Sequence, residues 1–189
     1  GSSIDTAVAF GPREPSMRKQ LSISHFLEAE EDLMHTKTIL LVEDNPDDRE
    51  LIRLALQQAD IPCKVETVFD GAKLADYLFA VGEYCHRDAR QMPDLILLDL
   101  KLPKLSGCKA LQMLQRVRGR PNLPPVIVFT SSDDEQDIAD AYSAGANSYI
   151  RKPVDFNEFI EKIRQVLLYW LDLNVPPPSR LRVAPSLFT

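Results

Sequence analysis

Two adjacent carboxylates, Glu43 and Asp44, follow the apolar run ILLV, at a point where a buried strand would end. Two further acids, Asp47 and Asp48, come after an Asn-Pro pair. We interpret the Asn-Pro pair as a helix start, and Asp47 and Asp48 as solvated acids of the first turn, where they favour the positive end of the helix dipole. This interpretation leaves Glu43 and Asp44 unexplained, because adjacent acids at the end of a buried strand are unfavourable unless a cation binds there.

Other residues that could do chemistry also follow apolar runs. Asp99 follows LILL, Thr130 follows VIVF, and Lys152 lies just after the run that ends at Ile150. Each alone has an ordinary explanation as a turn residue, a helix cap or a surface lysine. Taken together, three carboxylates, a hydroxyl and an ammonium after four separate runs indicate one composite site. Asp70, after a further run, is explained as a turn residue and helix cap.

The elements that must position these residues are predicted by hydrophobic period. The predicted strands are 39–42, 65–69, 95–98, 126–129 and 148–150. The predicted helices are 46–59, 71–81, 107–117, 133–144 and 155–171. Five alternations imply an α/β fold, a doubly wound parallel sheet with helices on both faces. Ligands bind such sheets at the carboxyl ends of the strands, so the candidate residues should meet at one edge.

Electrostatics indicates what would bind there. Like charges about 5 Å apart repel by roughly 3 kcal/mol per pair at an effective dielectric constant near 20, so Glu43, Asp44 and Asp99 cannot all stay ionised without compensation. Oxygen ligands without a nearby histidine or cysteine favour Mg²⁺ as the compensating cation. An open Mg²⁺ site beside a carboxylate and a lysine suits phosphoryl transfer, and the carboxylate can be the nucleophile.

Composition narrows the class of protein. A chain of 189 residues is long enough for one core, and a net charge of −6 argues against a nucleic-acid partner. The three cysteines are scattered, and the chain contains no run of apolar residues long enough to cross a membrane, so we expect a soluble, cytoplasmic protein. We expect an N-terminal extension at 1–35 that is a tag or a non-native start, one domain at 36–173 and a Pro-rich tail at 174–189.

The apolar runs that end in Glu43-Asp44, Asp99, Thr130 and Lys152-Pro153 closely resemble the receiver domain of two-component response regulators over residues 39–171. Pro103 and Gly107, which follow Asp99, belong to the same pattern. The resemblance implies a flavodoxin-like, five-stranded sheet in the order 2-1-3-4-5. It also implies that Asp99 accepts a phosphoryl group from a partner histidine kinase and that the protein then signals by a conformational change. Beyond Mg²⁺-dependent self-phosphorylation and autodephosphorylation, no enzyme activity is implied.

The resemblance also implies the metal ligands. Asp44, Asp99 and the backbone carbonyl of Lys101 would hold Mg²⁺, and Glu43 would act largely through water.

Three other residues receive roles from the resemblance. Lys152 would contact the phosphoryl oxygens, its placement set by a cis bond to Pro153, and Thr130 would hydrogen-bond the phosphoryl group. Tyr149 would be a switch residue that swings inward behind Thr130.

The long segment 82–93 and the ending YWLDLNVPPP are similar to the stand-alone regulators associated with bacterial phytochrome-type histidine kinases. The last predicted helix carries more apolar residues than one buried face needs, including Tyr169, Trp170 and Leu171. Since those relatives pair through this end of the chain, we expect a homodimer with Trp170 buried. The alternative is a tail that folds back on its own domain.

Two other functions compete with the regulator. An Mg²⁺-dependent aspartyl-phosphate phosphatase of the haloacid-dehalogenase type would need a second Asp two residues after Asp99, where Lys101 stands. A scaffold could use the receiver fold without phosphorylation, although a complete site argues against it. A P-loop nucleotide enzyme is excluded because the chain has no GxxxxGK stretch.

Overall fold

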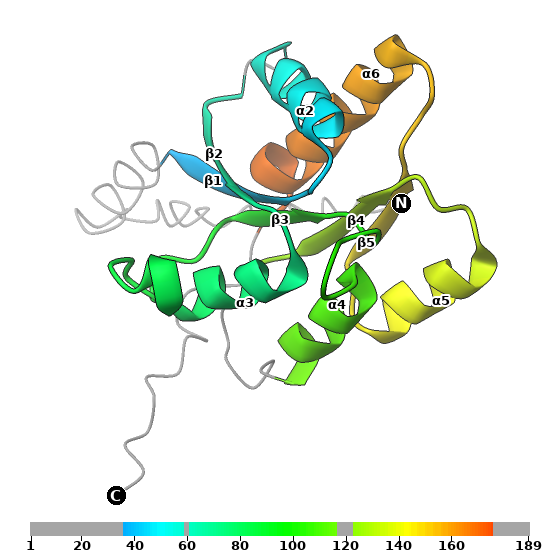
Figure 1. The fold of residues 1–189 in the computed structure, drawn as a ribbon. Coiled ribbons are helices and arrows are strands. Elements are labelled where there is room, and N and C mark those ends of the chain that lie inside the picture. Colours follow the sequence, from blue (N-terminus) through cyan, green and yellow to red (C-terminus); the bar gives the residue numbers. More distant parts are fainter. Residues whose placement is uncertain (1–35, 59–60, 117–122, 176–189) are drawn as a thin grey trace, which may run out of the picture. The chain divides into compact units, whose positions relative to one another are not determined.

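A computed structural model describes residues 36–58, 61–116 and 123–175 of the chain. The predicted N-terminal extension and nearly all of the predicted Pro-rich tail lie outside these residues. The described part is a three-layer α/β domain, with a central sheet between two layers of helices (Figure 1).

The sheet contains five parallel strands in the order β2-β1-β3-β4-β5, as the sequence predicts. Their bounds are β1 Lys37–Val42, β2 Cys63–Val68, β3 Leu95–Leu98, β4 Val126–Thr130 and β5 Ser148–Arg151. β3 and β4 are buried along their whole length, which explains why their sequences are continuous apolar runs rather than alternating ones.

Five α-helices lie between and after the strands: α2 Pro46–Gln58, α3 Gly71–Phe79, α4 Gly107–Arg116, α5 Glu135–Ser143 and α6 Phe156–Leu167. A 3₁₀-helix, η1 at Gly82–Tyr84, follows α3, and a π-helical segment, η2 at Leu168–Leu173, continues α6. Helices α2 and α6 cover one face of the sheet, and α3, α4 and α5 cover the other (Figure 1). No helix in the described ranges is long and apolar enough to cross a membrane.

Side-chain caps begin several helices. The Asn45 carboxamide accepts a hydrogen bond from the backbone N–H of Asp47 at 2.9 Å, which confirms the predicted start of α2. Asp70 caps α3 in the same way through the N–H of Lys73. Helix α3 ends two residues before its predicted end and α5 ends one residue before, whereas η2 carries the last helix past its predicted end at 171.

Successive side chains of each strand point to opposite faces of the sheet, which divides the core into two clusters. Leu40, Val42, Ile96 and Leu98 point to the α3, α4 and α5 side, whereas their sequence neighbours pack under α2 and α6. The registers Val42↔Leu98 and Thr130↔Arg151 bring the strand ends level with one another. The residues that follow these strands therefore meet at one edge of the sheet.

Candidate functional site

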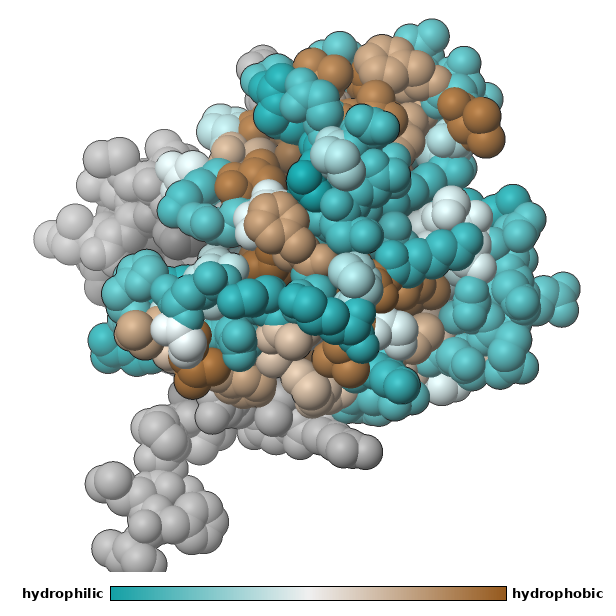
Figure 2. Space-filling model, viewed as in Figure 1, coloured by the Kyte–Doolittle hydropathy of each residue, from teal (hydrophilic) through white to brown (hydrophobic). Residues whose placement is uncertain are grey.

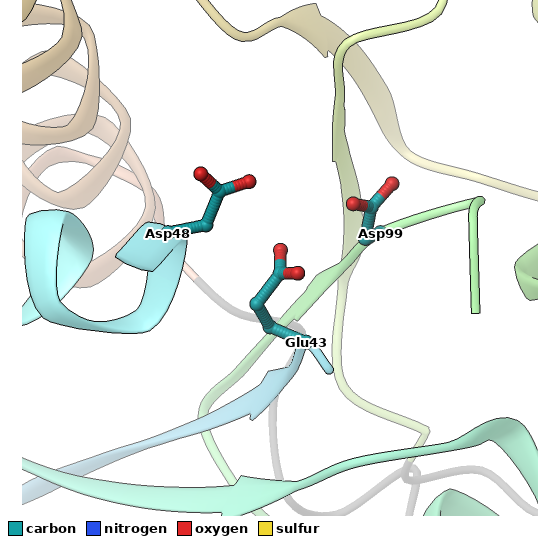
Figure 3. Close-up of side chains that lie close together, drawn as sticks. All are labelled: Glu43, Asp48 and Asp99. Atoms are coloured by element: carbon teal, nitrogen blue, oxygen red, sulfur yellow. The ribbon is translucent and has the colours of Figure 1, made fainter. Parts of the chain in front are cut away.

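Three carboxylates converge at the carboxyl edge of the sheet. Glu43 follows β1, Asp99 follows β3, and Asp48 projects from the first turn of α2, so each comes from a different element (Figure 3). One carboxylate oxygen from each lies within 4.8 Å of the others. Glu43 and Asp99 are buried, at 1% and 7% exposure, so their charges are held away from bulk water.

The Lys152 ammonium lies among these carboxylates. Its Nζ is 2.7 Å from Glu43 Oε2, 2.6 Å from Asp48 Oδ2 and 2.8 Å from Asp99 Oδ2. The Lys152 side chain is only 6% exposed, so these bonds form with little competition from water. Strand pairing sets its position, because the Lys152 N–H donates to the Thr130 carbonyl at 2.7 Å.

This arrangement shifts the pKa values of the two buried carboxyls, Glu43 and Asp99, in opposite directions. Burial raises the pKa of Glu43, and the nearby Asp99 charge adds to that increase, so it outweighs the opposing bond from Lys152. Burial also acts to raise the pKa of Asp99, but the Lys152 charge and hydrogen bonds from Lys152, the Lys101 N–H and the Thr130 hydroxyl overcome it and lower the pKa. The pKa of Lys152 is raised, because its carboxylate partners outweigh its own burial. Asp99 is therefore an ionised carboxylate held beside a fixed cation.

Neutral groups complete the surroundings of Asp99. The Lys101 N–H donates to Asp99 Oδ1 at 3.1 Å, and the fully buried Thr130 stands on the neighbouring strand β4. Farther along, the Tyr149 hydroxyl donates to the Ser132 carbonyl at 3.1 Å, so this half-buried ring already points toward the loop after β4. The structure thus brings Tyr149 to the side of the site, one loop away from Asp99.

The backbone beside Asp99 requires glycine at position 107. A Cβ on Gly107 would lie 2.4 Å from the Asp99 carbonyl oxygen and 2.7 Å from the Cα of Leu100. The Gly107 N–H donates to the Leu100 carbonyl at 3.0 Å, which closes the loop between β3 and α4. Gly107 of the sequence pattern therefore allows the backbone to pack closely beside Asp99.

Four of the predicted site residues are brought together, and Asp44 is not among them. Glu43, Asp99, Thr130 and Lys152 meet as the sequence predicts, but the Asp44 side chain is exposed and lies outside the three-carboxylate group. Its backbone carbonyl accepts a 2.6 Å hydrogen bond from Arg49 Nη1, which fixes the chain at this point. The role of Asp44 as a metal ligand stays a prediction.

Asp48 was not predicted as part of the site. The interpretation of Asp47 as a solvated acid agrees with its exposure, whereas for Asp48 it is wrong, because Asp48 pairs with Lys152. A signal was available in the sequence: Asp48 precedes Ile52 by four residues, and Ile52, Ala55 and Leu56 form the buried stripe of α2. An acid on that stripe must face the sheet.

The predicted cis bond before Pro153 is also wrong. The described residues contain no cis peptide bond, so Lys152 reaches its three carboxylates from a trans bond.

The donor set suits a hard divalent cation. The cluster of Glu43, Asp48 and Asp99 offers only carboxylate oxygens, and with one ammonium among three acids it has an excess of negative charge. A divalent cation at this edge would relieve that excess.

Comparisons with known proteins agree with this geometry. Residues 39–164 match the family described as the response regulator receiver domain. The chain is 35% identical over 151 residues to the probable methanogenesis regulatory protein FilR2 of Methanothrix harundinacea, covering 80% of this chain and 92% of that protein. It is 32% identical over 145 residues to the response regulator Rcp1 of Synechocystis sp., covering 76% of this chain and 95% of Rcp1.

Solved structures give the same result. The chain is similar to the phosphorylated cyanobacterial phytochrome response regulator RcpA, with a TM-score of 0.68 and 36% identity over 76% of this chain and 100% of that chain. It is similar to the Mn²⁺-bound form of Rcp1, with a TM-score of 0.66 and 30% identity over 75% of this chain and 99% of that chain. One relative was thus crystallised in a phosphorylated form and another with a divalent cation.

Proposed function

The chain belongs to the response regulator receiver domain family, and on that premise we propose that Asp99 is the residue that accepts the phosphoryl group. The observation that carries this assignment is the state of Asp99, an ionised carboxylate 2.8 Å from the Lys152 ammonium at the end of β3. A low pKa keeps the oxygen nucleophilic at neutral pH, and the fixed cation lies where negative charge would gather.

The transfer follows from these positions. An Asp99 carboxylate oxygen attacks the phosphorus of the donor, the new O–P bond forms, and the bond from phosphorus to the leaving group breaks with its electron pair on that group. With acetyl phosphate the leaving group is acetate, which needs no proton. The Lys152 ammonium and the Thr130 hydroxyl stabilise the three phosphoryl oxygens. The Lys101 N–H holds Asp99 in the attacking orientation.

We assign Mg²⁺ as the cation, because all available donors are oxygens. Asp44, Asp99 and the Lys101 carbonyl would hold it, with Glu43 acting through water. When bound, it supplies positive charge for the phosphoryl oxygens.

The partner we propose is a histidine kinase of the phytochrome type. The similarity to RcpA and to Rcp1 supports this assignment, since RcpA is described as a phytochrome response regulator. The proposed partner is tested with two purified kinases, one phytochrome-type and one unrelated. Each is labelled on its phosphohistidine and mixed with this protein. Faster loss of label from the phytochrome-type kinase to this protein is expected, and equal rates would contradict it.

Intact mass measurement tests the phosphoacceptor directly. After incubation with Mg²⁺ and acetyl phosphate the protein should gain one phosphoryl group, and Asp99→Ala should gain none, because no other described carboxylate combines contacts with Lys152, the Lys101 N–H and Thr130. Asp47→Ala, in the exposed first turn of α2, is the control and should be labelled normally. Labelling of Asp99→Ala at an acid-stable position would show that the assignment is wrong.

A further inference from the structure

Every hydrogen of the Lys152 ammonium has a carboxylate acceptor. An ammonium has three N–H groups and no acceptor, and the three partners are Glu43, Asp48 and Asp99. The shortest of the three contacts, at 2.6 Å, is the one to Asp48. A search limited to the residues that follow the strands does not find Asp48, because it lies in helix α2.

Asp48 is held by the helix that carries it. The Asn45 cap fixes the first turn of α2, and Ile52, one turn after Asp48, is buried under the helix at 1% exposure. The Asp48 side chain is 24% exposed, against 6% for Lys152, so it reaches in from the rim and covers the ammonium. Its position therefore does not depend on the loop after β3.

Phosphorylation changes only one of the three acceptors. When the O–P bond forms, the charge of the Asp99 carboxylate moves to the phosphoryl oxygens and the oxygen that Lys152 contacts becomes a weaker acceptor. Glu43 and Asp48 keep their chemistry. An ammonium held by two unchanged partners can redirect its third N–H to the phosphoryl group without leaving its place.

We propose that Asp48 is a positioning residue for phosphoryl transfer, whose carboxylate on α2 holds the Lys152 ammonium beside Asp99 before and after the group arrives. This inference rests on the proposed function. It differs from a metal-ligand role, because an anchor for Lys152 affects the rate of transfer when the cation is saturating.

The matched pair Asp48→Asn and Asp47→Asn tests the proposal in the full chain. Both remove one charge from the first turn of α2 without changing side-chain shape, but only Asp48 touches Lys152. Labelling by acetyl phosphate is followed by intact mass across a Mg²⁺ titration, and circular dichroism checks that both variants are folded. Asp48→Asn should lower the maximal rate by about tenfold, since a charge-assisted bond is replaced by a neutral one. The Mg²⁺ concentration for half-maximal rate should stay within about twofold of that of the unchanged protein.

A spectroscopic readout separates positioning from general damage. Beryllofluoride, a mimic of the phosphoryl group, is bound with Mg²⁺, and its ¹⁹F resonances report the groups around each fluorine. Asp48→Asn should shift at least one resonance, and Asp47→Asn should leave the spectrum unchanged. An unchanged maximal rate for Asp48→Asn overturns the proposal, and so does a higher Mg²⁺ requirement at that unchanged rate, which would make Asp48 a metal ligand. Failure of the unchanged protein to be labelled is a separate result, because it would contradict the proposed function itself.

Discussion

At the residue scale, neighbouring carboxyls of this site differ in acidity because they differ in partners. Glu43 and Asp99 are both buried and both contact Lys152. For Glu43 burial dominates and raises the pKa. For Asp99 burial acts in the same direction, but the Lys152 charge and hydrogen bond, with further bonds from the Lys101 N–H and the Thr130 hydroxyl, overcome it and lower the pKa. The Lys152 charge together with hydrogen bonds to the charged form, rather than burial alone, decides which of the two acids has the lower pKa.

The metal ligands can be tested at the same scale. Asp44→Asn should raise the Mg²⁺ dissociation constant by about tenfold, because a site with few protein ligands loses one charged donor. Calorimetric titration of Mg²⁺ without a phosphodonor measures this. Asp47→Asn, which alters the charge three residues away on an exposed side chain, should change the affinity little. Equal affinities for Asp44→Asn and the unchanged protein would remove Asp44 from the site.

At the element scale, one ion pair joins two loops beside the site. Asp70, the cap of α3, accepts a 2.7 Å bond from the Lys104 ammonium, and Lys104 lies in the loop that follows Asp99. Burial acts to raise the pKa of Asp70, but the bonds from Lys104 and from the N–H of Lys73 overcome it and lower the pKa. Lys104 also adopts a positive φ of 61°, so the loop is held in a conformation that few side chains favour.

The sign of the pH effect follows from that lowered pKa. A carboxyl whose pKa is lower in the folded state stabilises the fold above its unfolded pKa of about 3.9, and this contribution is lost as pH falls through the folded pKa. Lys104→Met should lower the free energy of unfolding at neutral pH by about 1 kcal/mol, because the ion pair with Asp70 is lost. The loss is small because the Lys104 side chain is largely exposed and solvent screens its charge. Lys104→Met should also lose less stability than the unchanged protein on acidification.

Urea unfolding at about pH 7 and about pH 3.5 checks both expectations. Lys109→Met, at an exposed lysine of α4, is the control and should leave the unfolding free energy nearly unchanged at both values. Parallel acid losses in Lys104→Met and the unchanged protein would show that the Asp70 pair does not set this pH dependence.

At the scale of the described domain, the last helix does not present the face that its sequence predicts. The helix changes to π-helical geometry at Leu168–Leu173. Trp170 and Leu171 are half-buried against the core cluster under α2 and α6. They also line a 560 Å³ pocket at the opposite edge of the sheet from Asp99, together with Lys37 and Val126.

Other apolar side chains of this region remain on the surface. Tyr169 is 53% exposed and Leu173 is 63% exposed. Hydrophobic surface also lies over the beginning of α6 (Figure 2), where Val154 and Phe156 are exposed. We keep the predicted homodimer as a proposal and move its contacts toward Tyr169 and Leu173, because Trp170 already packs within its own domain.

The oligomeric state can be tested with variants chosen from these exposures. Light scattering should show a dimer for the unchanged protein at micromolar concentration, and Tyr169→Ser with Leu173→Asp should give a folded monomer that still accepts a phosphoryl group. Val81→Asp, at an exposed valine beside α3 on the other face of the sheet, should remain dimeric. A monomer for the unchanged protein, with and without phosphodonor, would reject the homodimer.

The sequence by itself determined the class of fold and four members of the site. Apolar runs alternating with helical periods are sufficient for a parallel sheet, and strand ends of such a sheet must share an edge, so Glu43, Asp99, Thr130 and Lys152 could be placed together. The sequence pattern also predicted the capping residues of α2 and α3, because a cap depends only on residues within the first turn of the helix.

Only the tertiary structure decided which groups bind one another. Asp47 and Asp48 are adjacent and chemically identical, and the rotation of α2 on the sheet exposes one and turns the other to Lys152, 104 residues away. Trp170 is likewise seen to pack against the core cluster under α2 and α6 only in the tertiary structure. The buried stripe of α2 indicates which acid faces the sheet, but the partner that each side chain meets depends on packing between distant segments.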